Sequence, residues 1–190
     1  MSETVFTIGH STRSFDDFAL TLQDAGVELI VDVRRLPGSR RLPQFDADAL
    51  QTELARSGIG YRWIEALGGR RRPEPASINT GWIHSAFRGY ADYVATEEFA
   101  EGLGELLMLA GGLRTAVMCA EVLWWRCHRR IIADVLVSLG VGVVHLFSPG
   151  KSEPHRLAAP AWLDGGRLSY AAPRALTGAS ARGDRDSADR

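Results

Sequence analysis

The sequence VFTIGHSTRSFDDFALTLQDAGVELIVDV (residues 5–33) reads as strand, helix and strand, and this order decides the fold. Ser14, with an acidic residue three positions later, forms a capping box that begins the helix, and apolar residues then recur at helical spacing until Gly26. Residues 29–33 are apolar except for Asp32 near their end, which is typical of a strand buried on both faces. This stretch therefore predicts a βαβ unit.

The same alternation continues along the chain. Further strands are predicted at residues 61–64, 115–120 and 141–147, and further helices between Asp46 and Gly58, between Thr96 and Gly111, and over 131–139. Strands that alternate with helices of about 10 to 15 residues imply right-handed crossovers and a parallel sheet. We therefore predict an α/β fold, with a single domain over residues 1–150, a mainly parallel five-stranded sheet and flanking helices.

Two segments depart from this pattern. Residues 66–95 are rich in arginine and aromatic residues and follow neither period, so we predict an irregular insertion or an active-site flap. From Ser148 onward no periodic pattern is visible, and we predict a C-terminal extension over residues 151–190. Its last 20 or so residues are nearly all Ala, Gly, Ser, Pro, Arg and Asp, which predicts disorder.

The overall composition is that of a globular protein. With 190 residues, 45% hydrophobic and 24% charged, the chain has the length of one domain and enough apolar material for a core. No apolar run approaches the roughly 20 residues that span a bilayer, so we expect neither a membrane protein nor a membrane partner. The N-terminal residues MSETVFTIGHS carry no basic flank and no long apolar stretch, so we expect no signal peptide and a cytoplasmic location.

Positive charge is concentrated in one part of the chain, although the net charge is only −1. Residues 34–72 hold nine arginines and four acidic residues. Guanidinium groups suit bidentate binding of phosphate or carboxylate. The loop RRLPGSRRLPQF (residues 34–45) could therefore bind a polyphosphate or a nucleic-acid backbone, with a simple solvated loop as the alternative.

Chemically active side chains follow most of the predicted strands. In open α/β sheets, ligands bind beyond the carboxyl ends of the strands, so these residues are expected at one edge of the sheet. They are His10 and Ser11 after the first strand, Asp32, Arg34 and Arg35 at the second, Glu65 and Arg70 after the third, and Cys119 and Glu121 at the fourth.

The segment CAEVLWWRCHRR (residues 119–130) carries both cysteines. Cys119 ends a buried strand, and Cys127 and His128 stand where the next helix begins, so the positive end of the helix dipole can favour a thiolate. A cysteine of low pKa beside His and Arg is suited to nucleophilic or redox catalysis. The alternative is that both cysteines are ordinary core residues, since two cysteines are too few for a disulfide scaffold.

Metal binding is a third interpretation of the same residues. Cys119, Cys127, His128 and His10 are ligand types for a tetrahedral zinc site, or for iron, but the sequence lacks the CxxC pair that usually marks one. The sequence requires no cofactor. His10 itself lies in a Gly-His-Ser turn, where it is suited to act as a general base or to hydrogen-bond its own turn.

These observations give a set of candidate site residues. The candidate catalytic residues are Cys119, Glu121, Cys127, His128 and His10. The candidate substrate-binding residues are Ser11, Asp32, Arg34, Arg35, Arg40, Arg41, Arg70, Arg88, Tyr90 and Arg129. Aromatic residues on which a base or another flat ligand could stack, most of them expected in the core, are Trp63, Trp82, Phe87, Tyr90, Trp124 and Trp125.

Three functions follow from these candidates. The first is a cysteine-dependent enzyme, with Cys119 as nucleophile or redox thiol, acting on a nucleotide, a phosphorylated metabolite or a nucleic acid. The second is a non-catalytic module in which the basic segment binds nucleotide or nucleic acid and the cysteines are structural. The third is a Cys/His metal site. The sequence does not indicate an oligomeric state.

Five ordered motifs resemble a known family. TIGHS, VDVRRLPGSRRLPQF, EALGGRR, FRGYADY and CAEVLWWRCHRR match, in order, the pattern of the bacterial and archaeal family catalogued as domain of unknown function 488, over residues 4–147. The resemblance implies a compact α/β domain and places the family's hallmark, Cys-Ala-Glu followed by Cys-His-Arg, at residues 119–121 and 127–129. It implies no reaction, and residues 73–84 match none of the motifs.

Overall fold

The computed structural model describes residues 4–172 and contains a six-stranded sheet in the order β3-β2-β4-β1-β5-β6. The first five strands are mutually parallel, and β6 runs antiparallel to β5. The strands are β1 (Thr4–Gly9), β2 (Leu29–Asp32), β3 (Gly60–Trp63), β4 (Thr115–Cys119), β5 (Gly142–Ser148) and β6 (Lys151–Pro154). The predicted α/β fold with a mainly parallel sheet is confirmed, with one strand more than the five expected.

Three helices begin at the caps that the sequence predicts, Ser14, Asp46 and Thr96. The helices are α1 (Phe15–Asp24), α2 (Ala47–Arg56), α3 (Ser85–Tyr93), α4 (Glu97–Gly112) and α5 (Arg129–Ser138), with 3₁₀ turns η1 (Pro43–Phe45), η2 (Glu65–Leu67) and η3 (Trp124–Arg126). The Ser14 hydroxyl accepts from the Asp17 amide, and Thr96 caps α4 in the same way. Asp46 stands at the N-cap of α2, but its carboxylate accepts from the Ser39 amide instead.

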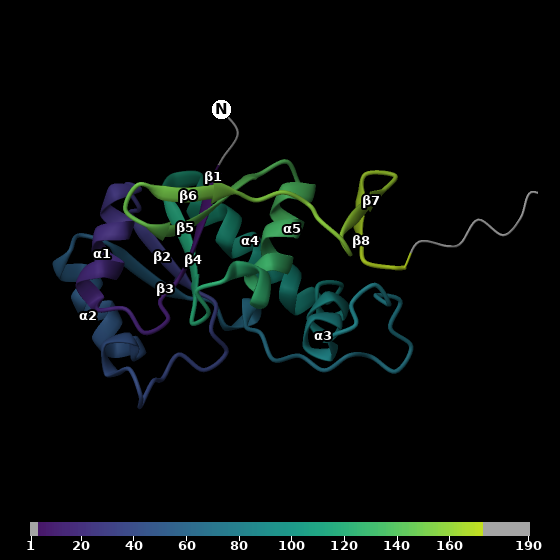
Figure 1. Ribbon diagram of the computed structural model, residues 1–190, viewed down its shortest axis with the longest axis horizontal. Helices are drawn as coiled ribbons and strands as arrows, with labels where there is room; N and C mark the ends of the chain where they lie inside the picture. The colour runs from purple at the N-terminus through teal and green to yellow at the C-terminus, as the bar shows by residue number, and fades with distance from the viewer. Residues whose placement is uncertain (1–3, 173–190) are drawn as a thin grey trace, which may run out of the picture.

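Two layers of helices enclose the sheet. Figure 1 shows α1 and α2 on one side of the sheet and α4 and α5 on the other. Because side chains alternate along a strand, Phe6 and Ile8 pack in the core under α1 and α2, whereas Val5 packs in the core under α4 and α5. The central strands are therefore buried on both faces, as the apolar run at residues 29–33 predicts.

Regular structure extends further than the sequence analysis predicts. The insertion predicted to be irregular contains the helix α3. The prediction that regular secondary structure ends at Ser148 is wrong, because β6 adds an edge strand to the sheet. β6 is polar and ends at Pro154, so it carries no apolar alternation, which is common for edge strands. A separate hairpin, β7 (Trp162–Asp164) and β8 (Arg167–Ser169), turns through two glycines of positive φ.

Two further predictions concern the far C-terminus and membrane-spanning helices. Residues 173–190, for which the sequence predicts disorder, lie outside the described residues. Within residues 4–172, no helix is long and apolar enough to cross a bilayer.

The strand order creates a crevice at the carboxyl edge of the sheet. β2 and β4 are neighbours, but β2 leads through α2 to β3 on one flank, whereas β4 leads through α5 to β5 on the other. Because these connections leave in opposite directions and on opposite faces, the segments that follow β2 and β4 diverge. Such a switch point is where α/β sheets place their ligands.

Candidate active site at the ends of two neighbouring strands

A cleft occupies the crevice between the ends of β2 and β4. Its first part is a cavity of about 210 Å³ whose lining includes Arg34, Arg35, Arg70, Cys119, Glu121 and His128. A second cavity, of about 390 Å³, shares Arg70, Cys119, Glu121 and His128 with the first and adds His84, Phe87, Trp125, Arg126 and Cys127. Together the two cavities form the cleft. Cys119 and His128 lie at their junction, and Cys127 lines the second cavity.

Both thiols converge on one imidazole nitrogen. Cys127 Sγ lies 3.6 Å and Cys119 Sγ lies 3.9 Å from His128 Nδ1. The two sulfurs and this nitrogen all lie within 4.8 Å of one another. Both cysteines are free and buried, whereas His128 is half-buried. β4 ends at Cys119 and α5 begins directly after His128, so the turn between these two elements brings the three side chains together.

A main-chain contact sets the tautomer of His128. Its Nε2 lies 3.0 Å from the carbonyl oxygen of Val33, at the end of β2. A carbonyl oxygen can only accept, so Nε2 carries the hydrogen, and in the neutral ring Nδ1 presents its lone pair to the thiols. His128 is therefore positioned as a proton acceptor for either cysteine.

The two thiols differ in acidity. A hydrogen bond to Cys127, together with burial, raises the pKa of the Cys119 thiol well above its usual value. Burial also acts to raise the pKa of Cys127, but the hydrogen bond from Cys119 and the nearby His128 and Arg129 outweigh it and hold the pKa of Cys127 well below its usual value. These opposite directions favour a thiolate at Cys127 and a neutral thiol at Cys119.

Arg129 supplies positive charge beneath this cluster. Its side chain is only 1% exposed, and it donates to the Thr7 hydroxyl and to the main-chain oxygens of Glu121 and Val122. Within residues 4–172, no carboxylate lies within ion-pair distance of its guanidinium, and its Nε has no hydrogen-bond partner. A buried cation with only neutral partners stabilises an anion nearby, and the Cys127 thiolate is such an anion.

Close packing holds the Glu121 turn over β1. A Cβ added to Gly9 would lie 1.9 Å from the Glu121 carbonyl oxygen, so only glycine allows this approach. Glu121 itself is exposed and lines both cavities.

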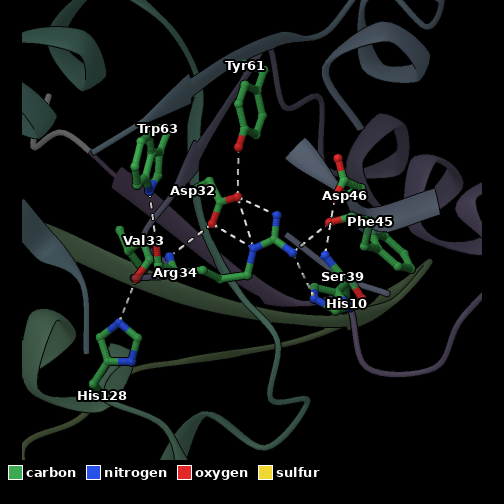
Figure 2. A network of polar contacts seen from close by, with 10 residues as sticks. All are labelled: His10, Asp32, Val33, Arg34, Ser39, Phe45, Asp46, Tyr61, Trp63 and His128. Carbon is green, nitrogen blue, oxygen red and sulfur yellow. Dashed lines mark hydrogen bonds and ion pairs between the residues drawn. The ribbon is translucent and has the colours of Figure 1, made fainter. Parts of the chain in front are cut away.

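A second polar network lies beside the thiols and holds the segment after β2. Figure 2 shows Arg34 bound to both carboxylate oxygens of Asp32, with Tyr61 donating to the same carboxylate at 2.8 Å. Arg34 also donates to the Phe45 carbonyl at 2.7 Å. Asp32 is fully buried and Arg34 nearly so, and most donors of this guanidinium are therefore used within the protein.

His10 belongs to this second network and not to the thiol cluster. Its ring stacks on Phe45 at 4.2 Å, its Nδ1 bonds the Ser11 carbonyl at 2.9 Å, and its Nε2 faces Arg34 at 3.5 Å. Burial lowers the pKa of His10 to about 4, against the hydrogen bond to Ser11, which raises it. His10 is thus neutral near pH 7 and does not complete a four-ligand metal cluster with Cys119, Cys127 and His128.

Comparison with known proteins identifies the family. The family model described as "Domain of unknown function DUF488" matches residues 14–136, which is more than half of the chain. The chain belongs to the DUF488 family. This confirms the resemblance seen in the five motifs. No curated protein and no solved structure matches the chain.

The remaining candidate residues of this DUF488 chain divide into two groups. Arg35 and Arg70 are exposed and line the cleft. Arg88 donates to the Trp82 carbonyl, and the buried Tyr90 donates to the Leu67 carbonyl at 2.7 Å. The candidates that line neither cavity are His10, Ser11, Asp32, Arg40, Arg41, Arg88, Tyr90 and Arg129. The DUF488 cleft thus brings together seven of the fifteen candidates: Arg34, Arg35, Arg70, Cys119, Glu121, Cys127 and His128.

The DUF488 cleft also contains residues outside the catalytic and substrate-binding candidates of the sequence analysis. These are His84, Ala86, Phe87, Trp125, Arg126, Leu36, Gly69 and Ala120. Phe87 and Trp125 do stand among the interleaved aromatic residues, but the other aromatic residues there include the buried Trp82 and Tyr90. Sequence alone does not separate exposed aromatic side chains from buried ones when the local period is irregular.

Proposed function

We propose that this chain is a cysteine-dependent enzyme that acts on an anionic substrate at the carboxyl edge of its sheet. The observation that carries the proposal is the meeting of two thiols and His128 Nδ1, within 4.8 Å, in a cleft that is also lined by arginines. A thiolate, an adjacent base and cationic binding groups are the parts that nucleophilic catalysis on an anion requires.

Each group at the junction has a distinct role in this proposal. Cys127 gives its proton to His128 Nδ1, and both N–H groups of the resulting imidazolium then have acceptors, the sulfur and the Val33 carbonyl. Cys127 Sγ forms the bond to the electrophilic atom of the substrate, and the leaving group departs with its electron pair and takes the proton from Nδ1. Cys127, in place of Cys119, is therefore the proposed nucleophile, and Cys119 donates a hydrogen bond to it.

Alkylation by iodoacetamide as a function of pH tests the proposal. We expect Cys127 to react with a midpoint well below the ordinary thiol value of about 8.5, and Cys119 to react more slowly at every pH. Loss of the buried charge in Arg129→Met should raise the Cys127 midpoint by about one pH unit. Arg130→Met is the matched control, because that guanidinium bonds the carbonyls of Ala158 and Ala159. Peptide mass spectrometry separates the two sites.

Slow alkylation of both cysteines would contradict the proposal. If both cysteines react only after unfolding, they are core residues and the enzyme proposal fails. The non-catalytic binding module then becomes the better interpretation, and it predicts binding of polyanions that weakens steeply with salt.

A metal centre is the second candidate, favoured by the spacing of the same three atoms. In a tetrahedral zinc site with Zn–S of about 2.3 Å and Zn–N of about 2.1 Å, sulfur and nitrogen ligands lie about 3.6 Å apart. Cys127 Sγ and His128 Nδ1 have this separation, and Nε2 of His128 has the carbonyl partner common for ligating histidines. About one zinc per chain in freshly purified protein, with cysteines protected until a chelator is added, would support this candidate over the thiolate.

Both candidates require reduced thiols. We therefore propose a cytoplasmic location, where cysteines as close as Cys119 and Cys127 stay free.

A further inference from the structure

The two cavities of the cleft differ in chemistry, although they share the residues at their junction. The first cavity is lined by the exposed Arg35 and Arg70, and by Arg34, whose guanidinium is bound to Asp32 and to the Phe45 carbonyl. The second presents aromatic rings, from Phe87 and Trp125, beside His84. A ligand that spans the cleft would therefore meet cations at one end and flat apolar surfaces at the other.

The cationic end has charge available for a ligand. Arg35 is exposed, and within residues 4–172 the hydrogen bond of its guanidinium is a long one, 3.4 Å to the Arg70 carbonyl. Within residues 4–172, no carboxylate lies within ion-pair distance of Arg35 or Arg70. Arg70 also has a φ of 61°, a left-handed conformation that is unusual for a residue other than glycine and that clusters at ligand sites.

The aromatic end has ring surface available for a ligand. The Trp125 side chain is 42% exposed and meets Trp124 edge-on, at 5.6 Å between ring centroids. Phe87 is half-buried and stacks on Trp82 at 4.8 Å. Large aromatic surfaces that border a polar cleft are typical stacking platforms for flat ligands.

We propose that this cleft binds a mononucleotide, with its phosphate against Arg35 and Arg70 and its base against Phe87 and Trp125. The sugar and the bonds on either side of it would then lie above the junction of the cavities, beside Cys119 and Glu121. A sugar phosphate would leave the aromatic end empty, and a nucleoside would leave the cationic end empty. The inference deepens the proposed function by naming its substrate class, but the binding itself does not depend on thiol chemistry.

Titration of intrinsic tryptophan fluorescence tests this binding. The ligands are the four common nucleoside monophosphates, the matching nucleosides and ribose 5-phosphate, each added to the full chain. We expect at least one nucleotide to bind about tenfold or more tightly than ribose 5-phosphate and than its own nucleoside, because a stacked base and a bound phosphate each contribute a factor of this order.

Variants separate the two ends of the site. The double variant Arg35→Met/Arg70→Met should bind the nucleotide and ribose 5-phosphate more weakly and the nucleoside as tightly as the parent. Measured by calorimetry, Trp125→Ala should bind the nucleotide and the nucleoside more weakly and ribose 5-phosphate as tightly as the parent. Arg40→Met/Arg41→Met and Trp162→Ala are matched controls, because these residues are exposed and line neither cavity. Thermal melting confirms that each variant is folded.

The inference is overturned if no nucleotide binds more tightly than ribose 5-phosphate, or if only single-stranded oligonucleotides bind. Its failure is distinct from failure of the proposed function, because the alkylation profile of Cys127 is measured without any nucleotide. If both hold, bound nucleotide should also slow the alkylation of Cys127.

Discussion

At the scale of the residue, Gly69 has no side chain because the imidazole of His128 occupies the space beside it. A Cβ at this position would lie 2.8 Å from His128 Nδ1, the atom that faces both thiols. The backbone of the Gly-Gly-Arg motif after β3 therefore packs directly against the imidazole of His128, the proposed base. This contact gives the second glycine of the motif a physical reason that the sequence alone does not reveal.

Gly69→Ala should impair the site more than the fold. The new methyl group must displace His128, so we expect a loss of about 1–3 kcal/mol in the free energy of unfolding and slower alkylation of Cys127 near neutral pH. Gly104→Ala is the matched control: nothing lies within 4 Å of its Cβ position in α4, so alanine should stabilise by up to about 1 kcal/mol. Denaturant unfolding and alkylation rates measure both effects, and unchanged reactivity in Gly69→Ala would contradict the assigned role of His128.

At the scale of the element, the end of β2 connects the Asp32–Arg34 network to the thiol cluster. The side chain of Asp32 holds Arg34, which in turn holds the Phe45 carbonyl in η1. The carbonyl of Val33, the residue after β2, accepts from His128 Nε2 just before α5 (Figure 2). The extended end of β2 thus connects the loop that follows it to the thiol cluster.

Asp32→Asn should be severely destabilising. The substitution leaves the Arg34 guanidinium buried without its counterion, and removing one partner of a buried ion pair costs about 3–5 kcal/mol. Glu105→Gln is the matched control, because its pair with Arg62 is largely exposed and should contribute less than about 1 kcal/mol. Urea unfolding of both variants and of the parent measures the loss in the free energy of unfolding. Similar losses in the two variants would show that the buried Arg34 is not stabilised by Asp32.

At the scale of the whole molecule, a hydrogen-bonded relay crosses the core behind the site. Arg129 donates to Thr7 Oγ1, which lies 2.7 Å from His145 Nδ1, and His145 Nε2 lies 2.9 Å from His155 Nδ1. His155 ends the relay on the buried Asp134, at 2.8 Å. The relay joins β1, β5 and α5 and connects a buried cation to a buried anion through two histidines.

These buried histidines predict a loss of stability in acid. Burial lowers the pKa of His145 to about 3 and that of His10 to about 4, so the folded protein keeps both neutral. The unfolded chain protonates them near pH 6.5 and thus binds more protons below that pH, so stability falls as pH drops from about 6.5 toward these lower values. The loss should be on the order of 2 kcal/mol per histidine at about pH 4.5.

Urea unfolding at about pH 7 and pH 4.5 measures this loss. The difference between the two pH values should shrink in His145→Gln and stay unchanged in His84→Gln, whose side chain is exposed. A parent protein that is equally stable at both pH values would mean that His145 and His10 titrate normally in the folded state.

The sequence by itself determined the elements of this protein and their alternation. Ser14 and Thr96 cap helices through local hydrogen bonds, and short apolar runs mark the central strands β1, β2 and β4 as buried. Such signals are short-range, so they can be read along the chain. The same short-range signals placed Cys119, Cys127 and His128 at the ends of a strand and a helix. The CAE and CHR motifs were among the five that indicated the family.

Only the tertiary structure decided which of these residues meet. The order β3-β2-β4-β1-β5-β6 puts the end of β2 beside the end of β4, so Arg35 and the thiols share a cleft while His10, at the end of β1, joins Asp32 and Arg34 instead. Strand order and side-chain convergence depend on how distant crossovers pack against the sheet, which no local period records. The same long-range packing sets the Val33 carbonyl against Nε2 of His128 and leaves Nδ1 facing the two thiols.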